Sequence, residues 1–599
     1  MSENNEKKRD SHFKSVLRML FGGRQDTSAL EEEMVQTPFK TMMKNFLERR
    51  LTRVGLTVFI VILLACLILP IFMNVDLTHQ DSSQTNVPPG MHMMRYPREL
   101  RGNAQMISPG SNFAVGLSND GRMYLWGMLD DRLRQVPGGM GTIVDVAAGL
   151  DHVVAMNDEG QLFTWGNTSF GLMNIPLSAQ NANIVALNSG FQISTALDDE
   201  GNLHVWGNEN MVSIITRGLE GRIVEWALNP NTALALMDDG RVELLTNRNL
   251  PQSDIPEHIH GRAIDVAMTD RHAAVVLDDG TVVVWGTNDP EVLEVPQEIQ
   301  GRVVSIEGAR SHFSVILNDN TVHSWGMNLL GQTNFPASAG NVAQLSIAYF
   351  QNYAIDADGN IHTWGLRGYL LGTDQFGRDV FTRLIYGGRF SLLVGAIAVI
   401  ISSTIGIILG CISGYYGGTI DMLCMRFQEI VSAIPFLPFA IILSWTIGNQ
   451  LSPTGRMIAI MVILGLLSWP PIMRLVRGQV LQAKENEYIT AARALGVREA
   501  SIVFKHIFPN IMGVIIVQVT IGLALAMLTE SGLSFIGFGV NEPVPTWGNM
   551  LNGANNSVVI RNHWWRVLFP AIALSSAALA INIIGDGLRE AVDPKAQGR

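Results

Sequence analysis

The sequence predicts a multi-domain protein in which an all-α, six-span membrane bundle carries an inserted all-β, seven-bladed propeller. Three observations lead to this prediction. The chain has 599 residues, which is too long for a single hydrophobic core. Uncharged apolar runs long enough to cross a bilayer occur at residues 54–72 and then only after Phe390. Between them, one short phrase recurs at intervals of 39 to 41 residues.

Residues 1–53 are charged and lead into the apolar run at 54–72. No small-residue cleavage pattern follows that run, so we interpret it as a retained membrane span and not as a signal peptide. Basic residues stand just ahead of it: Lys40, Lys44, Arg49, Arg50 and Arg53. By the positive-inside rule, residues 1–53 are expected in the cytoplasm. The chain is then expected to emerge on the outer side as a polar tether over 73–100.

Residues 101–365 contain seven copies of an acidic or Asn-Gly phrase that mostly ends in Trp-Gly, as in NDEGQLFTWG at 157–166. Each copy joins two alternating apolar runs through a turn, which is typical of a β-hairpin. Seven such units close into a propeller whose free edges are short. Leu245 stands in the fourth copy where the others have tryptophan. We expect the tryptophans to be structural anchors between blades: Trp126, Trp165, Trp206, Trp285, Trp325 and Trp364.

The repeat region is acidic, with about 30 Asp and Glu, about 12 Arg and no Lys. Such a surface repels phosphate backbones, so we expect no nucleic-acid partner. His152, His272 and His312 occupy one place in their repeats. A metal ring is one interpretation, but the other four copies carry different residues there, so we prefer a packing role and expect no metal. The three cysteines of the chain lie in or beside apolar runs, so no disulfide framework is predicted.

Five further apolar runs follow the repeats and, with the first, make six spans that return the C-terminus to the cytoplasm. They lie at about 390–412, 434–447, 457–473, 511–533 and 568–584. Basic residues mark the loop between the fourth and fifth spans as cytoplasmic: Arg474, Arg477, Lys484, Arg493, Arg498 and Lys505.

Some charged residues near the spans need a separate interpretation. Arg378, Arg383 and Arg389 fall outside, against the charge rule, and we give them less weight because they adjoin a large translocated domain. For Glu530, near the end of the fifth span, we expect interfacial solvation. The Pro470-Pro471 pair is expected to kink the fourth span.

The cytoplasmic loop reads ENEYITAARALGVREASIVFKHIFPN over 485–510. Glu487 to Leu495 suits a helix, and Gly496 ends it because glycine accepts the left-handed conformation of a helix end. Residues 497–508 can form a second helix, which Pro509 ends before the next span. Small residues at Ala491 and Ala492 allow close approach of another surface. We therefore predict a docking element.

This loop resembles the permease signature of ATP-binding-cassette importers, in which two alanines precede a glycine and an apolar-Pro ending. Thr490, His506 and Phe508 depart from that signature. Further phrases resemble the second, C-type subunit of the dipeptide/oligopeptide/nickel permease family. They are LGTDQFGRDVFTRLIYGGRFSLLVG (371–395), SWPPIMRLVRGQV (468–480), LSFIGFGVNEPVPTWGNML (533–551) and GDGLREAVDPK (585–595). The likeness covers residues 37–72 and 366–599. The repeats of 101–365 resemble the regulator-of-chromosome-condensation family, which is specific for the fold and weak for function.

The resemblance implies a permease subunit of an ATP-driven importer for peptides or related small solutes in a bacterial or archaeal cell (inner) membrane. Its implied partners are two ATP-binding-cassette subunits, a second permease subunit, an extracytoplasmic substrate-binding protein and the lipid bilayer. The chain has no Gly-rich phosphate loop, so we expect a non-enzyme without cofactor. The residues expected to couple it to the ATPase are Glu487, Tyr488, Ala491, Ala492, Leu495, Gly496 and Pro509.

The propeller at 101–365 is expected outside the cytoplasm, because the ends of a closed propeller emerge together and allow insertion into a loop. Docking of the binding protein or of another exported partner, ligand sensing and passive spacing are three uses for it, of which we prefer docking. The alternative function is a membrane-anchored propeller receptor or adhesin whose spans serve mainly as an anchor. It leaves the loop at 485–510 unexplained. A GTPase exchange factor is a weaker alternative, since the domain is expected outside.

Overall fold

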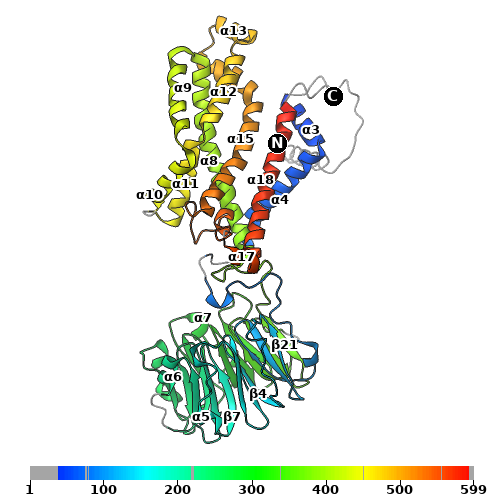
Figure 1. The fold of residues 1–599 in the computed structure, drawn as a ribbon, viewed down its shortest axis with the longest axis vertical. Helices are drawn as coiled ribbons and strands as arrows, with labels where there is room; N and C mark the ends of the chain where they lie inside the picture. Colours follow the sequence, from blue (N-terminus) through cyan, green and yellow to red (C-terminus); the bar gives the residue numbers. More distant parts are fainter. Residues whose placement is uncertain are drawn as a thin grey trace, which may run out of the picture. The chain divides into compact units, whose positions relative to one another are not determined.

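The computed structural model describes residues 38–73, 77, 80–216, 221–336, 339–448, 451–554 and 556–592 (Figure 1). Internal contacts divide the chain into two compact units. One unit is helical and combines residues up to Asp81 with those from Leu371 onward, and the other is Ser82–Leu370. The predicted fold class, a β domain inserted into a helical membrane bundle, is confirmed.

The β unit contains seven three-stranded antiparallel sheets within its described residues, each joining strands in chain order. They are β1–β3 (Ala104–Pro109, Phe113–Ser118, Met123–Gly127), β4–β6 (Ile143–Ala148, His152–Asn157, Leu162–Gly166), β7–β9 (Ile184–Ser189, Ile193–Asp198, Leu203–Gly207), β10–β12 (Ile223–Leu228, Ala233–Met237, Val242–Leu245), β13–β15 (Ala263–Met268, His272–Leu277, Val282–Gly286), β16–β18 (Val303–Ala309, His312–Leu317, Val322–Gly326) and β19–β21 (Val342–Ile347, Gln351–Asp356, Ile361–Gly365). Short helices lie between sheets: α5 (Leu177–Gln180), α6 (Glu209–Ile215) and α7 (Pro290–Leu293).

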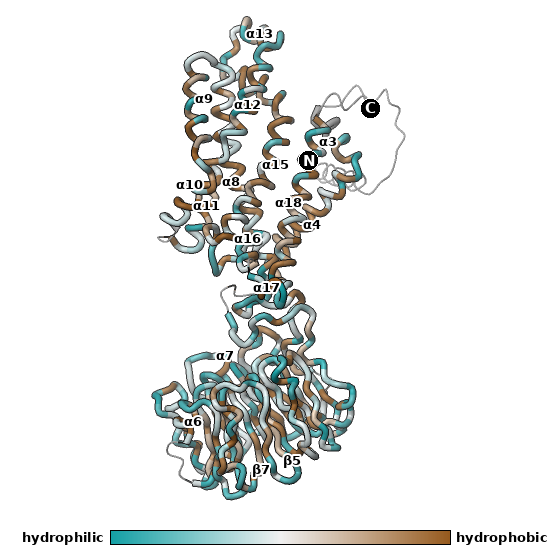
Figure 2. The backbone as a smooth tube through the Cα atoms, viewed as in Figure 1, coloured by the Kyte–Doolittle hydropathy of each residue, from teal (hydrophilic) through white to brown (hydrophobic). Residues whose placement is uncertain are grey.

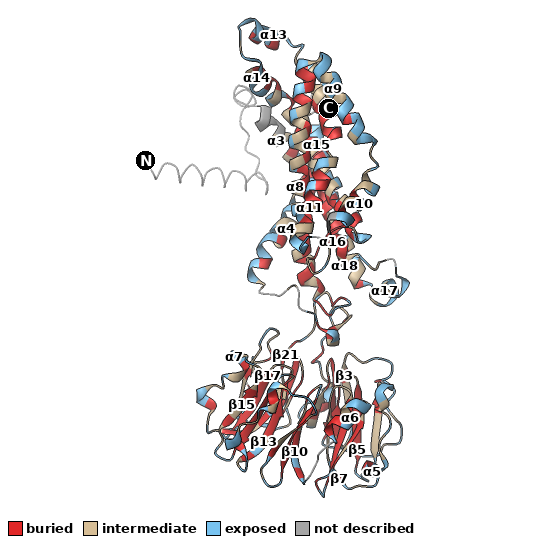
Figure 3. Ribbon diagram, turned by 90° about the vertical axis from the view of Figure 1, so that its left-hand side faces the viewer, coloured by how far each residue is buried: buried red, intermediate tan, exposed pale blue. Residues whose placement is uncertain are grey.

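The sheets form a ring around a central cavity of about 480 Å³, which the first strand of every sheet lines. The middle strands are buried along their length, apart from the last residue of β20, because neighbouring sheets cover both of their faces (Figure 3). Burial on both faces places apolar residues at adjacent positions of these strands, such as Val153, Val154 and Ala155, so the alternation that we predicted does not hold for them.

The repeat tryptophans join one sheet to the next. Five of them donate from Nε1 to a backbone carbonyl 32 to 34 residues earlier, in the segment that arrives from the preceding sheet. Trp126 of the first sheet instead donates to the Tyr353 hydroxyl of the last sheet at 3.1 Å, which closes the ring. All six tryptophan side chains are buried.

Residues 82–100, which we expected to form a tether, pack against the last sheet. Val87, Met93 and Leu100 are buried, and Val87 and Met93 lie in one apolar cluster with Phe350 and Leu366. The Met93 amide donates to the carbonyl of residue 367 at 2.9 Å. The β unit therefore begins before the first repeat.

Each of the three repeat histidines has a hydrogen-bond partner, which for His152 and His312 lies in the next sheet. The Nε2 atoms of His152, His272 and His312 hydrogen-bond to the Ser194 hydroxyl, the Thr287 carbonyl and the Asn352 amide oxygen, respectively. In the described part of the chain no group of three or more His, Cys, Asp and Glu residues could hold a metal ion. The contacts support a packing role for these histidines.

The helical unit is built from both ends of the chain. Its helices are α3 (Pro38–Glu48), α4 (Arg50–Phe72), α8 (Val380–Tyr416), α9 (Gly418–Ala433), α10 (Phe436–Gly448), α11 (Pro453–Leu467), α12 (Pro470–Ala483), α13 (Glu487–Ala494), α14 (Glu499–Ser501), α15 (Phe508–Phe535), α16 (Trp547–Met550), α17 (Ser557–Asn562) and α18 (Trp565–Val592). Apolar residues dominate the long helices, whereas α13 is more polar (Figure 2).

By length and composition, five helical stretches of the described residues can cross a membrane, or six if α9 and α10 count as one span bent by 75°. The predicted span at 434–447 corresponds to α10, which has 13 residues and needs α9 to reach spanning length. The fourth predicted span corresponds to Pro453–Ala483. It changes from α11 to α12 between Leu467 and Pro470, next to the predicted proline kink.

Small residues allow α8 and α12 to pack closely. Gly406, Gly410 and Gly414 recur at every fourth position of α8, so they share one face. A Cβ atom on any of them would lie 2.7 to 2.8 Å from a side chain of α12. Glycine at this spacing is the usual way for membrane helices to approach.

Candidate functional site

The loop at 485–510 begins with α13, which ends as predicted at Gly496. The backbone of Gly496 has φ +72°, in the left-handed region. The Val497 amide donates to the Ala492 carbonyl and the Gly496 amide to the Arg493 carbonyl, which is the hydrogen-bond pattern of a Schellman cap. A Cβ on Gly496 would meet nothing within 4 Å, so the conformation of this residue, and not crowding, favours glycine.

One face of α13 is fixed to the bundle. Ile489 is fully buried and Ala492 is 8% exposed. Both lie in an apolar cluster with Tyr415 of α8, Val480 of α12 and Ile507, which precedes α15. Residues of α8, α12 and α15 therefore all contribute to the packing of α13.

The opposite face of α13 and its C-terminal turn are open to solvent. The exposed residues are Glu487, Tyr488, Ala491, Leu495 and Gly496. Leu495 is 83% exposed, so its apolar side chain is free to contact another surface. The Tyr488 hydroxyl accepts a hydrogen bond from the Asn510 side chain at 3.1 Å, which ties α13 to the first turn of α15. Of the predicted site residues, Ala492 alone faces inward.

The second part of the loop differs from the prediction. We expected one helix over 497–508 that Pro509 ends. Instead α14 is short, residues Ile502–Ile507 form a π-helix, and α15 follows directly. Pro509 lies in the first turn of α15 and is exposed. The prediction was wrong because the first turn of a helix has no use for the N–H that proline lacks.

An ion pair braces the bundle below α13. The Arg477 guanidinium of α12 donates to both carboxylate oxygens of Asp421 in α9, each at 2.6 Å. The Ser413 hydroxyl of α8 donates to the same carboxylate. Two parallel bonds fix both position and angle, so α12 is held to the turn between α8 and α9. Sequence analysis treated Arg477 only as a basic loop residue, because its partner is 56 residues away.

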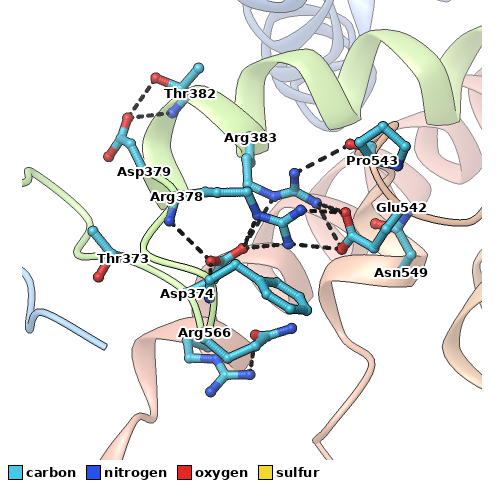
Figure 4. Close-up of polar contacts among 12 residues, drawn as sticks. Thr373, Asp374, Arg378, Asp379, Thr382, Arg383, Glu542, Pro543, Asn549 and Arg566 are labelled. Carbon is cyan, nitrogen blue, oxygen red and sulfur yellow. Dashed lines mark hydrogen bonds and ion pairs between the residues drawn. The ribbon is translucent and has the colours of Figure 1, made fainter. Parts of the chain in front are cut away.

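At the other end of α8, four charged side chains form a cluster in which Asp374, Arg378 and Arg383 are buried and Glu542 is 39% exposed (Figure 4). Arg378 donates to Asp374 at 2.8 Å and to Glu542 at 2.6 and 3.0 Å. Arg383 donates to Glu542 at 2.9 Å and to the Pro543 carbonyl at 3.4 Å. The two arginine side chains are only 4% and 3% exposed. The cluster therefore joins the segment before α8 to the loop after α15.

The charges in this cluster compensate one another. Burial alone lowers the pKa of Arg378, but hydrogen bonds to Glu542 and Asp374 outweigh it and leave that pKa raised. The arginine stays charged and paired. Neither Arg378 nor Arg383 is therefore a free positive charge.

Glu530 of α15 is linked through Ser534 to the loop that follows α15, the same loop that carries Glu542. Its side chain is fully buried, and Ser534 and Ser531 donate to it at 2.6 and 3.3 Å. The Val540 amide donates in turn to the Ser534 hydroxyl at 3.0 Å. Our prediction of interfacial solvation for Glu530 was wrong. The hydroxyls one and four residues further along α15 were the available signal, because positions i and i+4 share a helix face.

Comparison with known proteins assigns these features to families. A family model described as the binding-protein-dependent transport system inner membrane component matches residues 406–598. A model of the N-terminal TM domain of oligopeptide transport permease C matches residues 37–89, and a regulator of chromosome condensation (RCC1) repeat matches residues 143–172.

Individual relatives agree. The dipeptide transport system permease protein DppC of Bacillus subtilis (strain 168) is 43% identical over 224 residues, which are 37% of this chain and 68% of that protein. The oligopeptide transport system permease protein OppC of Haemophilus influenzae is 42% identical over 231 residues, which are 38% of this chain and 72% of that protein. This chain belongs to the binding-protein-dependent permease family. The permease is thus a non-catalytic, multi-pass membrane subunit of a peptide transporter.

Solved structures resemble the β unit of the permease. The CRINKLY WD40 ectodomain of the receptor kinase ACR4 from Arabidopsis thaliana aligns with 44% of this chain and 94% of its own, at 19% identity and a TM-score of 0.36. The predicted resemblances, to a peptide permease outside the insert and to the chromosome-condensation repeat within it, are confirmed.

Proposed function

We propose that this chain forms half of the translocation path of an ATP-driven importer for peptides or related small solutes. Its partners are two ATP-binding-cassette subunits, a second permease subunit and an extracytoplasmic substrate-binding protein. Relatives named as dipeptide and oligopeptide permeases support the substrate class. The chain has no Walker-type phosphate loop, which places ATP hydrolysis in the partners.

The observation that carries this proposal is the two-sided construction of α13. Its inner face is anchored in a cluster shared with α8, α12 and the start of α15, and its outer face exposes Leu495 and Tyr488. In this proposal an ATPase subunit contacts the outer face. ATP-driven closure of the ATPase pair then moves the three helices together and opens the path on alternate sides of the membrane.

We place α13 and both termini in the cytoplasm, and the propeller on the extracytoplasmic side. Support comes from where the insert leaves the helical unit. The Tyr386 hydroxyl near the start of α8 donates to the carbonyls of Pro70 and Met73 at the end of α4, at 3.2 and 3.0 Å. The opposite end of α8 carries Tyr415, which packs against α13. The insertion points thus lie at the end of α8 away from α13.

In this arrangement the propeller serves as a docking platform for the binding protein or another exported partner. Its position between the first two spans gives it access to proteins outside the cytoplasm. Its hydrogen-bonded ring makes it a rigid support, as expected of an element that presents a surface.

Co-purification of a full-length Leu495→Asp variant with its ATPase subunits tests the proposal. Leu495 is almost fully exposed, so the change leaves folding intact but places a charge in an apolar contact. We expect the ATPase subunits and ATP-dependent peptide uptake to be lost. Leu329→Asp, at a 63% exposed leucine of the propeller, is the matched control and retains both. Normal uptake by Leu495→Asp would contradict the proposal and favour the anchored receptor.

A further inference from the structure

The first strand of every propeller sheet contains a β-bulge at its second residue. In all seven sheets the register between the first and middle strands shifts at this position. A bulge leaves its extra residue unpaired and turns its side chain away from the regular pleat. We name these residues the bulge ring: Gln105, Val144, Val185, Val224, Ile264, Val304 and Ala343.

The bulge ring is exposed and largely apolar. Its β-branched members are 38% exposed at Val144 and 52% to 56% exposed at the other four. The ring lies on the strands that line the central cavity, at the end where those strands begin. Five exposed β-branched side chains thus occupy the same position in five sheets, each just ahead of the residues of its strand that line the channel, and we call this set the apolar rim.

The channel inside this rim is acidic. Glu225 and Asp265 directly follow ring residues, and Glu307 lies two residues deeper on β16. Asp265 accepts hydrogen bonds from the amides of Val266 and Ile306, so it has a structural role between sheets. In contrast, the Glu307 side chain is exposed to the channel.

The negative charges have no nearby compensation. Arg310 is the one basic side chain among the residues that line the channel, and it lies towards the far end, 4.0 Å from Asp270. Desolvation by the surrounding protein, together with the negative charges of Asp265 and Glu225, raises the pKa of Glu307 to about 8. Desolvation raises the pKa values of Glu225 and Asp265 to about 6. A positive charge next to Glu307 offsets the desolvation of its carboxylate and the repulsion from Asp265 and Glu225.

We propose that this mouth of the propeller docks an extended polypeptide segment of a partner protein that inserts one lysine or arginine side chain into the channel. Apolar side chains on either side of the inserted residue rest on the bulge ring. The basic head then lies among Glu225, Asp265 and Glu307, where the charges are complementary. The cavity of about 480 Å³ has room for one such side chain.

The same features argue against other ligands. Phosphate backbones are repelled by the channel carboxylates. These carboxylates are not grouped closely enough to hold a metal ion, according to the described residues. An apolar rim around a negative interior matches a basic side chain with apolar neighbours, because each part of the surface then meets its chemical complement.

Calorimetric titration of the purified full-length chain with an acetylated, amidated pentapeptide of sequence AVKVA tests this inference. Two matched peptides carry norleucine or glutamate in place of lysine. We expect AVKVA to bind, and the other two to bind at least about 10-fold more weakly, since a hydrogen bond to a charged group is worth about 1.5 to 3 kcal/mol.

Variants locate the binding in the channel. Glu307→Gln keeps the shape of the side chain, and we expect it to weaken AVKVA binding about 10-fold. Ile264→Ser removes part of the rim, and we expect a loss of about 3-fold. Glu294→Gln, at an exposed glutamate outside the channel, is the control and has no effect. Absence of AVKVA binding at millimolar concentration, equal binding of the norleucine peptide, or unchanged affinity in Glu307→Gln each overturns the inference.

This inference adds the chemistry of the partner to the docking role proposed above. The titration needs neither ATPase subunits nor transport. A negative result therefore removes the channel site and leaves the importer proposal standing. Normal uptake by the Leu495→Asp variant does the reverse, because it contradicts the importer proposal and leaves the channel site untouched.

Discussion

The two units of this permease are stabilised in different ways. The propeller repeats one set of contacts, in which a tryptophan donor reaches back to the segment before its own sheet. The fourth repeat lacks this tryptophan, and Leu245 is buried in its place. The helical unit instead depends on contacts that occur once, such as the Arg383–Glu542 pair and the seam at Gly410. Repeated contacts tolerate the loss of one member, whereas single contacts do not.

The largest expected effect comes from breaking the charge cluster around Arg378 and Arg383, two buried arginines. Arg383→Ala leaves Glu542 and Asp374 with one guanidinium between them, and we expect the helical unit to lose about 3 kcal/mol or more. The cysteines Cys66, Cys411 and Cys424 all belong to the helical unit, so a thiol-reactive dye follows its unfolding. Arg389→Ala, at an exposed arginine on the same helix, is the control. Equal unfolding midpoints for the two variants would show that the cluster is dispensable.

The next effect concerns the seam between α8 and α12. In Gly410→Ala the new methyl group would lie 2.7 Å from Val476 and 2.9 Å from the Met473 carbonyl. Overpacking of this kind costs about 1 to 3 kcal/mol. The matched variant Gly532→Ala places a methyl group where nothing lies within 4 Å, and we expect it to be neutral or slightly stabilising. The same dye assay measures both, and a stable Gly410→Ala variant would mean that the helices separate easily.

A single change in the propeller has a smaller expected effect. Trp325→Phe removes the donor to the Val292 carbonyl, now at 3.0 Å, and keeps most of the ring packing. We expect a loss of about 1 kcal/mol, or about 2 to 4 °C in the unfolding midpoint of the propeller. Near-ultraviolet circular dichroism measures that midpoint. Collapse of the whole propeller in this variant would contradict the tolerance that its repeats imply.

The smallest expected effect depends on pH, because the Glu307 side chain is exposed and solvent in the channel screens its charge. The pKa of Glu307, raised in the folded state, favours its protonated form, so folding stability declines as pH rises from about 4.5 towards 8. Glu307→Gln removes this dependence. We expect the variant to unfold at a higher temperature than the parent at pH 8 and at the same temperature at pH 4. An identical difference at both pH values would show that Glu307 does not titrate in this range.

Local and repeated features were predictable from the sequence. The period of 39 to 41 residues gave the number of sheets because each repeat carries its own turn and apolar runs. The end of α13 at Gly496 was predictable because a helix cap depends on adjacent residues. The family resemblance followed from separate phrases in the right order, each short enough to recognise without knowledge of the fold.

Features that depend on distant partners were not predictable. The carboxylate of Glu542 lies 164 residues from Arg378 in sequence, so no local pattern joins them. Glu530 is near the end of an apolar run, and its burial depends on the loop that follows α15, although Ser531 and Ser534 were a local signal. Residues 82–100 have tether-like composition but meet Phe350 and Leu366 once the ring is closed. The helix pair α9 and α10 is bent by 75°, so a search for straight apolar runs found α10 and missed α9.

The central claim is that α13 is the contact through which an ATPase subunit moves the helical unit. A photoreactive amino acid at position 495, in the full chain assembled with its ATPase subunits, tests this most directly. We predict a cross-link from position 495 to an ATPase subunit, with a yield that changes when ATP binds, and none from position 329 in the propeller. Absence of the cross-link from an assembled, active transporter would contradict the account.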